Sequence, residues 1–156
     1  MSGHHGPLTS LSIHPGASQS DKRAEMTDLL LTSSMDWTIK LWNPKQRKTP
    51  LYSFEASQEY VYDVKWSPVH PSVFASVNYG GSVDIWNLNT NKEAPVVRGQ
   101  VQDKDPHPLN CLKWNNDGRR LIVGDSMGYV TLFNVHGDLA TPTEEDFDKV
   151  QSLIDL

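Results

Sequence analysis

The sequence predicts an all-β fold of repeated antiparallel strand units, followed by one C-terminal α-helix. Short segments alternate between apolar and polar residues, which is the period of a pleated strand rather than of a helix. These segments form three related groups, and Gly, Pro, Asn and Asp residues at turn positions separate them. The segment after residue 140 departs from this pattern, because its apolar residues recur at helical spacing.

The clearest copy of the unit lies between residues 60 and 87. Its first apolar run ends at Trp66, because Pro68 and Pro71 follow and proline cannot donate to a strand ladder. A second apolar run leads to Gly80-Gly81, whose freedom at positive φ suits a tight hairpin. A third run with alternating residues closes the copy. The pattern predicts three consecutive strands, at residues 61–66, 73–77 and 82–86.

Related copies lie on each side of the central one. In all three, the last strand ends in an aromatic residue followed by Asn. The closing aromatic residues are Trp42, Trp86 and Phe133, at intervals of 44 and 47 positions. This period is close to the roughly 40–45 residues of a four-stranded propeller blade. The repeat therefore predicts three β-propeller blades in which these three rings occupy equivalent buried positions between blades. The expected blades are approximately residues 3–56, 57–100 and 101–137.

The flanking blades differ in their remaining elements. A polar insertion lengthens the first blade. In the second blade, Pro95 is compatible with an outer strand because that strand is an edge. The third blade has no fourth strand of its own. The expected strands are residues 8–14, 29–33, 38–42 and 51–54 in the first blade, 94–98 as the outer strand of the second, and 109–114, 121–124 and 129–135 in the third.

A C-terminal helix follows the blades, so the chain divides into blades at 1–140 and a helix at 141–156. Thr141-Pro142-Thr143-Glu144 matches a capping box with proline at the first helical position. Phe147, Val150 and Ile154 then recur at helical spacing. The sequence predicts an amphipathic helix over residues 142–155.

Particular residues in these copies resemble WD-repeat β-propeller blades. The first copy has Gly3-His4 before its first strand, Asp36 in its hairpin and Trp42 at its end. Such blades use His, Asp, Ser or Thr and Trp in a buried hydrogen-bond network. The resemblance implies this network for the first copy. The second and third copies have Gly80 and Met127 at the hairpin position, so they can hold at most part of it.

A closer resemblance links residues 3 to about 135 with the C-terminal propeller region of cytoplasmic dynein intermediate chains. Trp37 after the hairpin Asp and the segment from 50 to 71 are the most particular features. The resemblance implies a non-catalytic subunit of the dynein motor complex that binds the dynein heavy chain, located in the cytoplasm on the microtubule cytoskeleton. Other dynein subunits, including light chains, and dynactin would be bound by a part that precedes this sequence. The alternative is a generic WD-repeat adaptor in another assembly, such as a ubiquitin ligase or a chromatin complex.

Composition excludes several other classes. The formal net charge of −5 disfavours nucleic acid as the main partner, because phosphate binding needs clustered Lys and Arg. No apolar run has the length of a membrane span. No nucleophile elbow, phosphate-binding glycine loop or His-x-x-x-His pair occurs, so we expect neither an enzyme nor a cofactor. The single cysteine, Cys111, lies in an apolar strand, where we expect a buried small hydrophobe.

One proline-bounded loop contains Asp103, Asp105 and His107, which are types that ligate metals. Alternating polar residues in such a loop are more often solvated, so we expect no metal site. Three blades are also fewer than the 4 to 8 that typically close a ring. We expect the chain to be the last part of a longer propeller, as a truncated gene model would be, with self-association into a ring as the alternative.

Loops at one end of the blades form the candidate binding surface. In an antiparallel meander, the loops that enter each blade and the hairpins between its second and third strands share one end. Tyr, Trp and Met are enriched at protein interfaces, so these types mark the expected contact with the heavy chain. The candidate residues are Met35, Trp37, Glu59, Tyr60, Tyr79, His107 and Met127.

Overall fold

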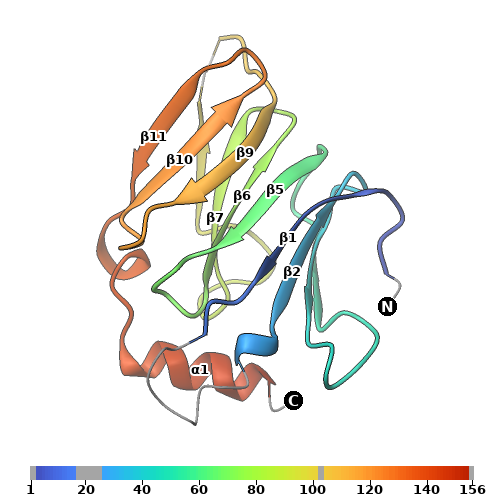
Figure 1. Ribbon diagram of the computed structural model, residues 1–156, viewed down its shortest axis with the longest axis vertical. Helices are drawn as coiled ribbons and strands as arrows, with labels where there is room; N and C mark the ends of the chain where they lie inside the picture. The colour runs from blue at the N-terminus through green and yellow to red at the C-terminus, as the bar shows by residue number, and fades with distance from the viewer. Residues whose placement is uncertain (1–2, 17–25, 102–103, 155–156) are drawn as a thin grey trace.

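A computed structural model describes residues 3–16, 26–101 and 104–154 (Figure 1). It consists of three antiparallel sheets, each a meander of consecutive strands. The first sheet contains β1 (Leu8–Ile13), β2 (Leu30–Ser34), β3 (Ile39–Trp42) and β4 (Tyr52–Phe54). The second contains β5 (Val61–Trp66), β6 (Val73–Asn78), β7 (Ser82–Asn87) and β8 (Val97–Gln100). The third contains β9 (Leu109–Trp114), β10 (Arg120–Asp125) and β11 (Val130–Asn134). The all-β class is confirmed.

The register of the sheets confirms the alignment of the three closing aromatic residues. Each of them pairs across the ladder with an apolar residue near the start of the preceding strand. The pairs are Leu30 with Trp42, Phe74 with Trp86, and Leu121 with Phe133. The three hairpins are therefore built on the same plan.

Side-chain to backbone hydrogen bonds join the inner strands of neighbouring sheets. The Thr9 hydroxyl donates to the Val61 carbonyl at 2.6 Å. Asp63 on β5 accepts the Leu112 N–H of β9 at 2.9 Å, and the Trp114 indole donates back to the Lys65 carbonyl at 3.1 Å. The backbone groups of Val61, Lys65 and Leu112 are thus satisfied across sheets, which holds each blade against the next.

Two apolar clusters fill the spaces between the sheets. The first contains Phe54, Phe74 and Trp86, whose ring centroids lie 5.2 to 5.7 Å apart, between the first and second sheets. The second lies between the second and third sheets and includes Leu112 and Leu121. Trp42 and Trp86 are buried as expected. Phe133 is only partly buried, because no fourth strand of the third sheet covers it among the described residues.

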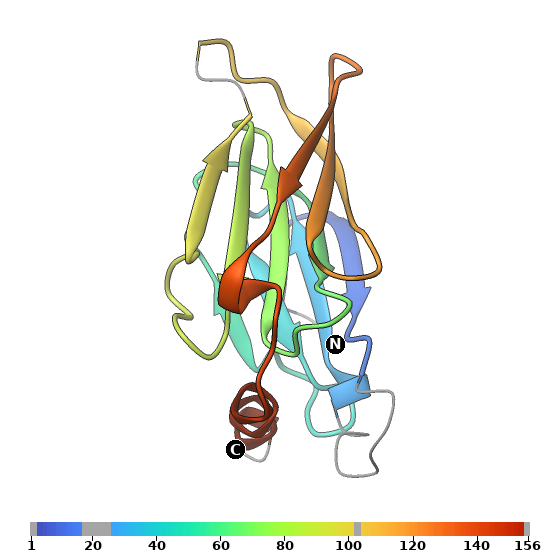
Figure 2. The same cartoon turned by 90° about the vertical axis from the view of Figure 1, so that its left-hand side faces the viewer.

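The C-terminal helix α1 (Glu144–Ile154) crosses the lower end of the first two sheets (Figures 1 and 2). Val150 and Ile154 are buried in the first apolar cluster. Asn89 donates to the Asp146 carbonyl at 3.0 Å, and Gln46 donates to the Ile154 carbonyl at 2.6 Å. The helix therefore returns from the third sheet to contact the first two.

The helix begins at Glu144, two residues later than predicted. Thr143 takes the capping position in place of Thr141: its N–H and its hydroxyl both donate to the Asp146 carboxylate, at 2.9 and 2.8 Å. The carboxylate of Asp146 therefore satisfies the N–H of the capping residue Thr143, and Pro142 lies before the helix. Residue 155 lies outside the described residues.

Two further expectations about the strands are wrong. The outer strand of the second sheet begins at Val97, after Pro95, because Asn91 holds the preceding residues in a turn by accepting the N–H groups of Glu93 and Ala94. Cys111 is exposed rather than buried. Its ladder partner is Gly124, which has no side chain to cover the thiol.

The polar insertion of the first blade falls mostly on residues outside the described ranges. Where the chain is described again, Met26 is buried and residues 26–28 form a single helical turn before β2. Over the described ranges, no helix is long and apolar enough to cross a membrane.

Candidate protein-interaction surface

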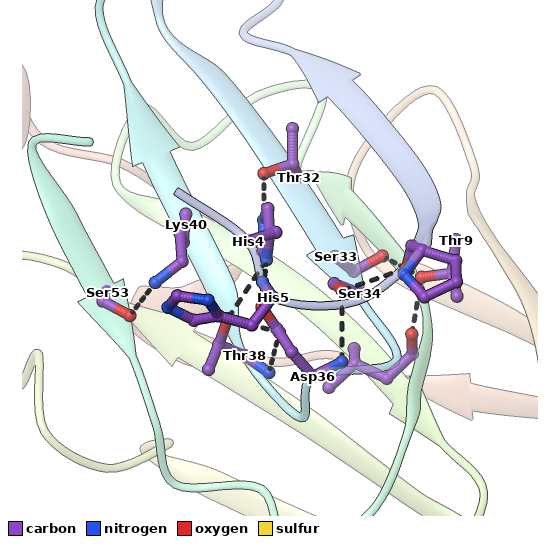
Figure 3. Close-up of polar contacts among 12 residues, drawn as sticks. His4, His5, Thr9, Thr32, Ser33, Ser34, Asp36, Thr38, Lys40 and Ser53 are labelled. Atoms are coloured by element: carbon purple, nitrogen blue, oxygen red, sulfur yellow. Dashed lines mark hydrogen bonds and ion pairs between the residues drawn. The ribbon is translucent and has the colours of Figure 1, made fainter. Parts of the chain in front are cut away.

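The hairpin between β2 and β3 rests on a buried network centred on His4 (Figure 3). The His4 ring lies 2.8 Å from the Asp36 carboxylate through Nδ1 and 2.7 Å from the Thr32 hydroxyl through Nε2. The Trp42 indole N–H donates to the same Thr32 hydroxyl at 2.8 Å. Asp36 also accepts from the Thr38 hydroxyl at 2.6 Å. The network implied for the first copy, with His4, Asp36 and Trp42, is therefore present.

Hydrogen bonds hold Asp36 in its charged form. Burial raises the pKa of this carboxyl, but hydrogen bonds from Thr38, His5 and His4 outweigh burial and hold its pKa well below the usual range. The His5 backbone N–H supplies one of them, at 2.9 Å. The loop before β1 and the hairpin after β2 are thus fixed to each other.

The second and third hairpins keep only parts of this network. The Trp86 indole donates to Ser76 at 3.2 Å, as Trp42 does to Thr32. Asn78 accepts the Ser82 N–H at 3.1 Å and so replaces the hairpin carboxylate. In the third hairpin, Asp125 accepts the N–H groups of Met127 and Tyr129, both at 2.9 Å. A different side chain therefore closes each turn, in keeping with Gly80 and Met127 at the position that Asp36 holds in the first hairpin.

One position in the hairpins has a positive φ in all three sheets. Gly81 and Gly128 occupy it in the second and third, with φ of 82° and 88°. In the first sheet the position is held by Trp37, with φ of 71°, the only residue other than glycine with positive φ among the described residues. A side chain there costs roughly 1–2 kcal/mol. The fold alone favours glycine at this position, and Trp37 departs from that preference.

The three hairpins lie along one edge of the assembled sheets, opposite α1 (Figure 1). We call this edge, with Met35, Trp37, Glu59, Tyr60, Tyr79, His107 and Met127, the hairpin edge. Its large apolar side chains are exposed, with Trp37 at 49% and Tyr79 at 47%. Exposed apolar side chains gathered at one edge are typical of a protein-binding surface.

The described contacts bring part of this set together. The rings of Tyr60 and Tyr79 lie 6.1 Å apart in an edge-on arrangement. Glu59 lies against Gly80, and the His107 backbone lies against Gly81. These residues surround the second hairpin. Met35 and Trp37 belong to the first hairpin and Met127 to the third, on either side of that group.

Sequence reasoning missed two aromatic residues of this edge. Tyr129 follows Gly128 and is 60% exposed. Tyr62 lies 6.2 Å from Tyr79 and extends the aromatic group to three rings. Both could have been found, because each stands within two residues of a predicted turn.

The aspartate and histidine loop does not assemble a metal site in the part of the chain that the structure describes. His107 and Asp105 approach to 3.9 Å, and Asp103 lies outside the described ranges. No three potential ligands converge among the described side chains.

Curated proteins similar to this chain include two dynein intermediate chains. The chain is 41% identical over 146 residues to the cytoplasmic dynein 1 intermediate chain of Drosophila melanogaster. The aligned region covers 94% of this chain and 21% of that protein. It is 31% identical over 139 residues to the dynein axonemal intermediate chain 2 of Mus musculus, covering 89% and 20% respectively. The chain thus spans about a fifth of the length of these relatives.

Solved structures and a family model agree on the fold. The WD40 domain of coronin from Toxoplasma gondii superposes with a TM-score of 0.69, at 19% identity, over 85% of this chain and 32% of that one. The WD domain, G-beta repeat family matches residues 1–43 and 48–87, which is more than half of the chain. The buried His4 network and the repeated hairpins are the structural counterpart of this match. The chain belongs to the WD domain, G-beta repeat family.

Proposed function

We propose that this chain is part of a cytoplasmic dynein intermediate chain, a non-catalytic subunit that binds the dynein heavy chain for microtubule-based transport. The observation that carries the proposal is the 41% identity to a cytoplasmic dynein 1 intermediate chain along 94% of this chain. The axonemal relative is less similar over a comparable length. This difference favours the cytoplasmic class and a location on cytoplasmic microtubules.

The hairpin edge is the surface that we assign to the heavy chain. It combines exposed Trp, Tyr and Met side chains, which are the types that supply anchors at interfaces. The positive φ of Trp37 supports the assignment, because a position that favours glycine holds a large exposed ring. Glu59 and His107 add polar groups at the rim of the aromatic patch.

Other dynein subunits, including light chains, and dynactin would be bound by a part of the subunit that precedes these blades. In this arrangement the blades hold the heavy chain, and the preceding part recruits the remaining components. Nucleic acid and membrane insertion have no place in the proposal.

Purification of the tagged protein from cell extract, followed by mass spectrometry, tests the proposal. We expect cytoplasmic dynein heavy chain among the most abundant partners. Recovery of axonemal heavy chain instead would move the subunit to the other class. Recovery of a ubiquitin ligase or chromatin complex without any heavy chain would overturn the proposal in favour of a generic WD-repeat adaptor.

A further inference from the structure

A cavity of about 130 Å³ lies where α1 crosses the ends of the first two sheets, opposite the hairpin edge. Its walls are mainly apolar side chains from three separate parts of the chain. They include Leu41, Leu51, Leu88, Val150 and Leu153. Engineered apolar cavities of about 150 Å³ take up benzene. This cavity therefore has room for one apolar side chain.

The residues that line the cavity include two cations and no carboxylate. Arg47 and Lys92 both line it. Neither has an ion-pair partner among the described residues, whereas Lys45 nearby in sequence is paired with Asp28 at 2.7 Å and Lys149 with Glu145 at 2.7 Å. In a chain with a net charge of −5, two unpaired cations at one apolar opening form a local positive site.

An open hollow continues from the mouth along the outside of α1. It shares Tyr52, Leu88, Lys92 and Leu153 with the cavity and is otherwise lined by polar side chains. Asn89 is one of them, and its buried Oδ1 has no hydrogen-bond donor within the described ranges. The hollow carries one carboxylate, Glu93, against Lys92 and the paired Lys149. A bound segment can thus extend along the helix within this polar hollow.

We propose that this site binds an acidic peptide segment of a partner protein, with one apolar side chain in the cavity and flanking carboxylates beside Arg47 and Lys92. Charge complementarity selects an acidic segment, because a basic or neutral one would leave both cations unpaired. The size of the cavity selects a single apolar anchor. The site lies at the opposite end of the sheets from the hairpin edge, so it is separate from the proposed heavy-chain contact.

A fluorescein-labelled acidic heptapeptide with a central Phe and Glu at its other positions tests the proposal by fluorescence anisotropy. We expect saturable binding to the protein that weakens as salt is raised, since the flanking contacts are ionic. The same peptide with a central Ser, and one with Lys in place of Glu, should each bind at least tenfold more weakly. Equal binding of the Phe and Ser peptides would show that no apolar side chain enters the cavity. No binding of the Phe peptide would overturn the proposal.

Charge reversal locates the site. Arg47→Glu with Lys92→Glu should weaken the Phe peptide at least tenfold. Lys104→Glu with Lys113→Glu is the matched control, because both of these lysines are exposed and lie elsewhere, and it should bind as the parent does. Unchanged affinity in the first pair would overturn the assignment.

Filling the cavity provides a second variant with an intact surface charge. Leu153→Phe extends a partly buried side chain that lines the cavity, so it should exclude the peptide while thermal unfolding stays cooperative. If the parent binds dodecanoate but neither peptide, the occupant of the site is a lipid and the peptide proposal is overturned. If the protein self-associates and the Arg47→Glu, Lys92→Glu variant does not, the occupant of the site is a second copy of the chain and not a peptide.

Discussion

Trp37 and Gly81 occupy the same turn position in successive sheets, and both have a positive φ, of 71° and 82°. The Trp37 side chain is half exposed, whereas glycine adopts this conformation at no steric cost.

Replacing Trp37 by Gly should therefore leave the free energy of unfolding unchanged or raise it by up to about 1 kcal/mol, because relief of the strained φ offsets the added freedom of the unfolded chain. Thermal and urea unfolding measure this change. Trp37→Ala is the control, since it removes the ring and keeps the unfavourable conformation. Marked destabilisation by Trp37→Gly would mean that the ring contributes to folding.

Trp86 and Phe133 should differ in their contribution to stability although they close equivalent strands. Trp86 is buried and its ring stacks on Phe74 with an interplanar angle of 7°, so Trp86→Ala should cost about 3–5 kcal/mol. Phe133 is only partly buried, so Phe133→Ala should cost about 1–2 kcal/mol. Denaturant unfolding of both variants checks the ratio, and equal costs would show that the third sheet is covered more fully than these contacts indicate.

The His4 network should make stability depend on acid pH through Asp36. Its folded-state pKa lies below the ordinary value, so the charged carboxylate stabilises the fold above about pH 4 and that contribution is lost as the pH falls further. Asp36→Asn should cost about 1–3 kcal/mol near neutral pH, since the amide lacks the negative charge and keeps only one acceptor oxygen for His4, His5 and Thr38. The difference in unfolding free energy between parent and variant should begin to narrow as the pH is lowered from 6 to 3. A constant difference would contradict this role.

His14 should give a second pH dependence, in a higher range. Burial lowers its pKa, and the hydrogen bond to the Pro71 carbonyl opposes that effect without overcoming it. Its Nδ1 accepts the Gly16 N–H at 3.0 Å, so the folded state favours the neutral ring. Because the unfolded ring takes up a proton below about pH 6.5, stability should fall as the pH drops below that value.

The contribution of one such proton is at most about 1.4 kcal/mol per pH unit. Replacing His14 by Gln should flatten the stability profile between pH 7.5 and 5.5, as calorimetry over this range would show. An unchanged slope would assign the pH dependence to other groups, such as His70, whose pKa burial also lowers.

Local sequence patterns predicted the strands and hairpins well because those patterns depend on nearest neighbours. The period-2 segments and the Gly80-Gly81 turn determine β5 to β7 almost to the residue. The helix was predicted from its apolar spacing, but its cap shifted because Asp146 competes with Glu144 for the capping role.

Features that depend on contacts between distant segments could not be predicted. Cys111 has an apolar neighbourhood in sequence, but its cross-strand partner is Gly124, which only the register reveals. The place of α1 on the first two sheets, and with it the cavity beside Leu88, likewise depends on packing across more than 50 positions. The positive φ of Trp37 becomes meaningful only when the hairpins are compared in space.

Recovery of dynein heavy chain with a variant of the hairpin edge tests the account most directly. Trp37→Gly combined with Tyr79→Ala removes two exposed rings from this edge, and Val97→Ala removes exposed apolar surface on β8 as a control. Each protein is purified from cell extract, and heavy chain is quantified by mass spectrometry. The account predicts at least a tenfold loss of heavy chain with the double variant, a parent-like yield with Val97→Ala, and melting temperatures close to the parent for both. Full recovery of heavy chain by a folded double variant would contradict the assignment of the hairpin edge.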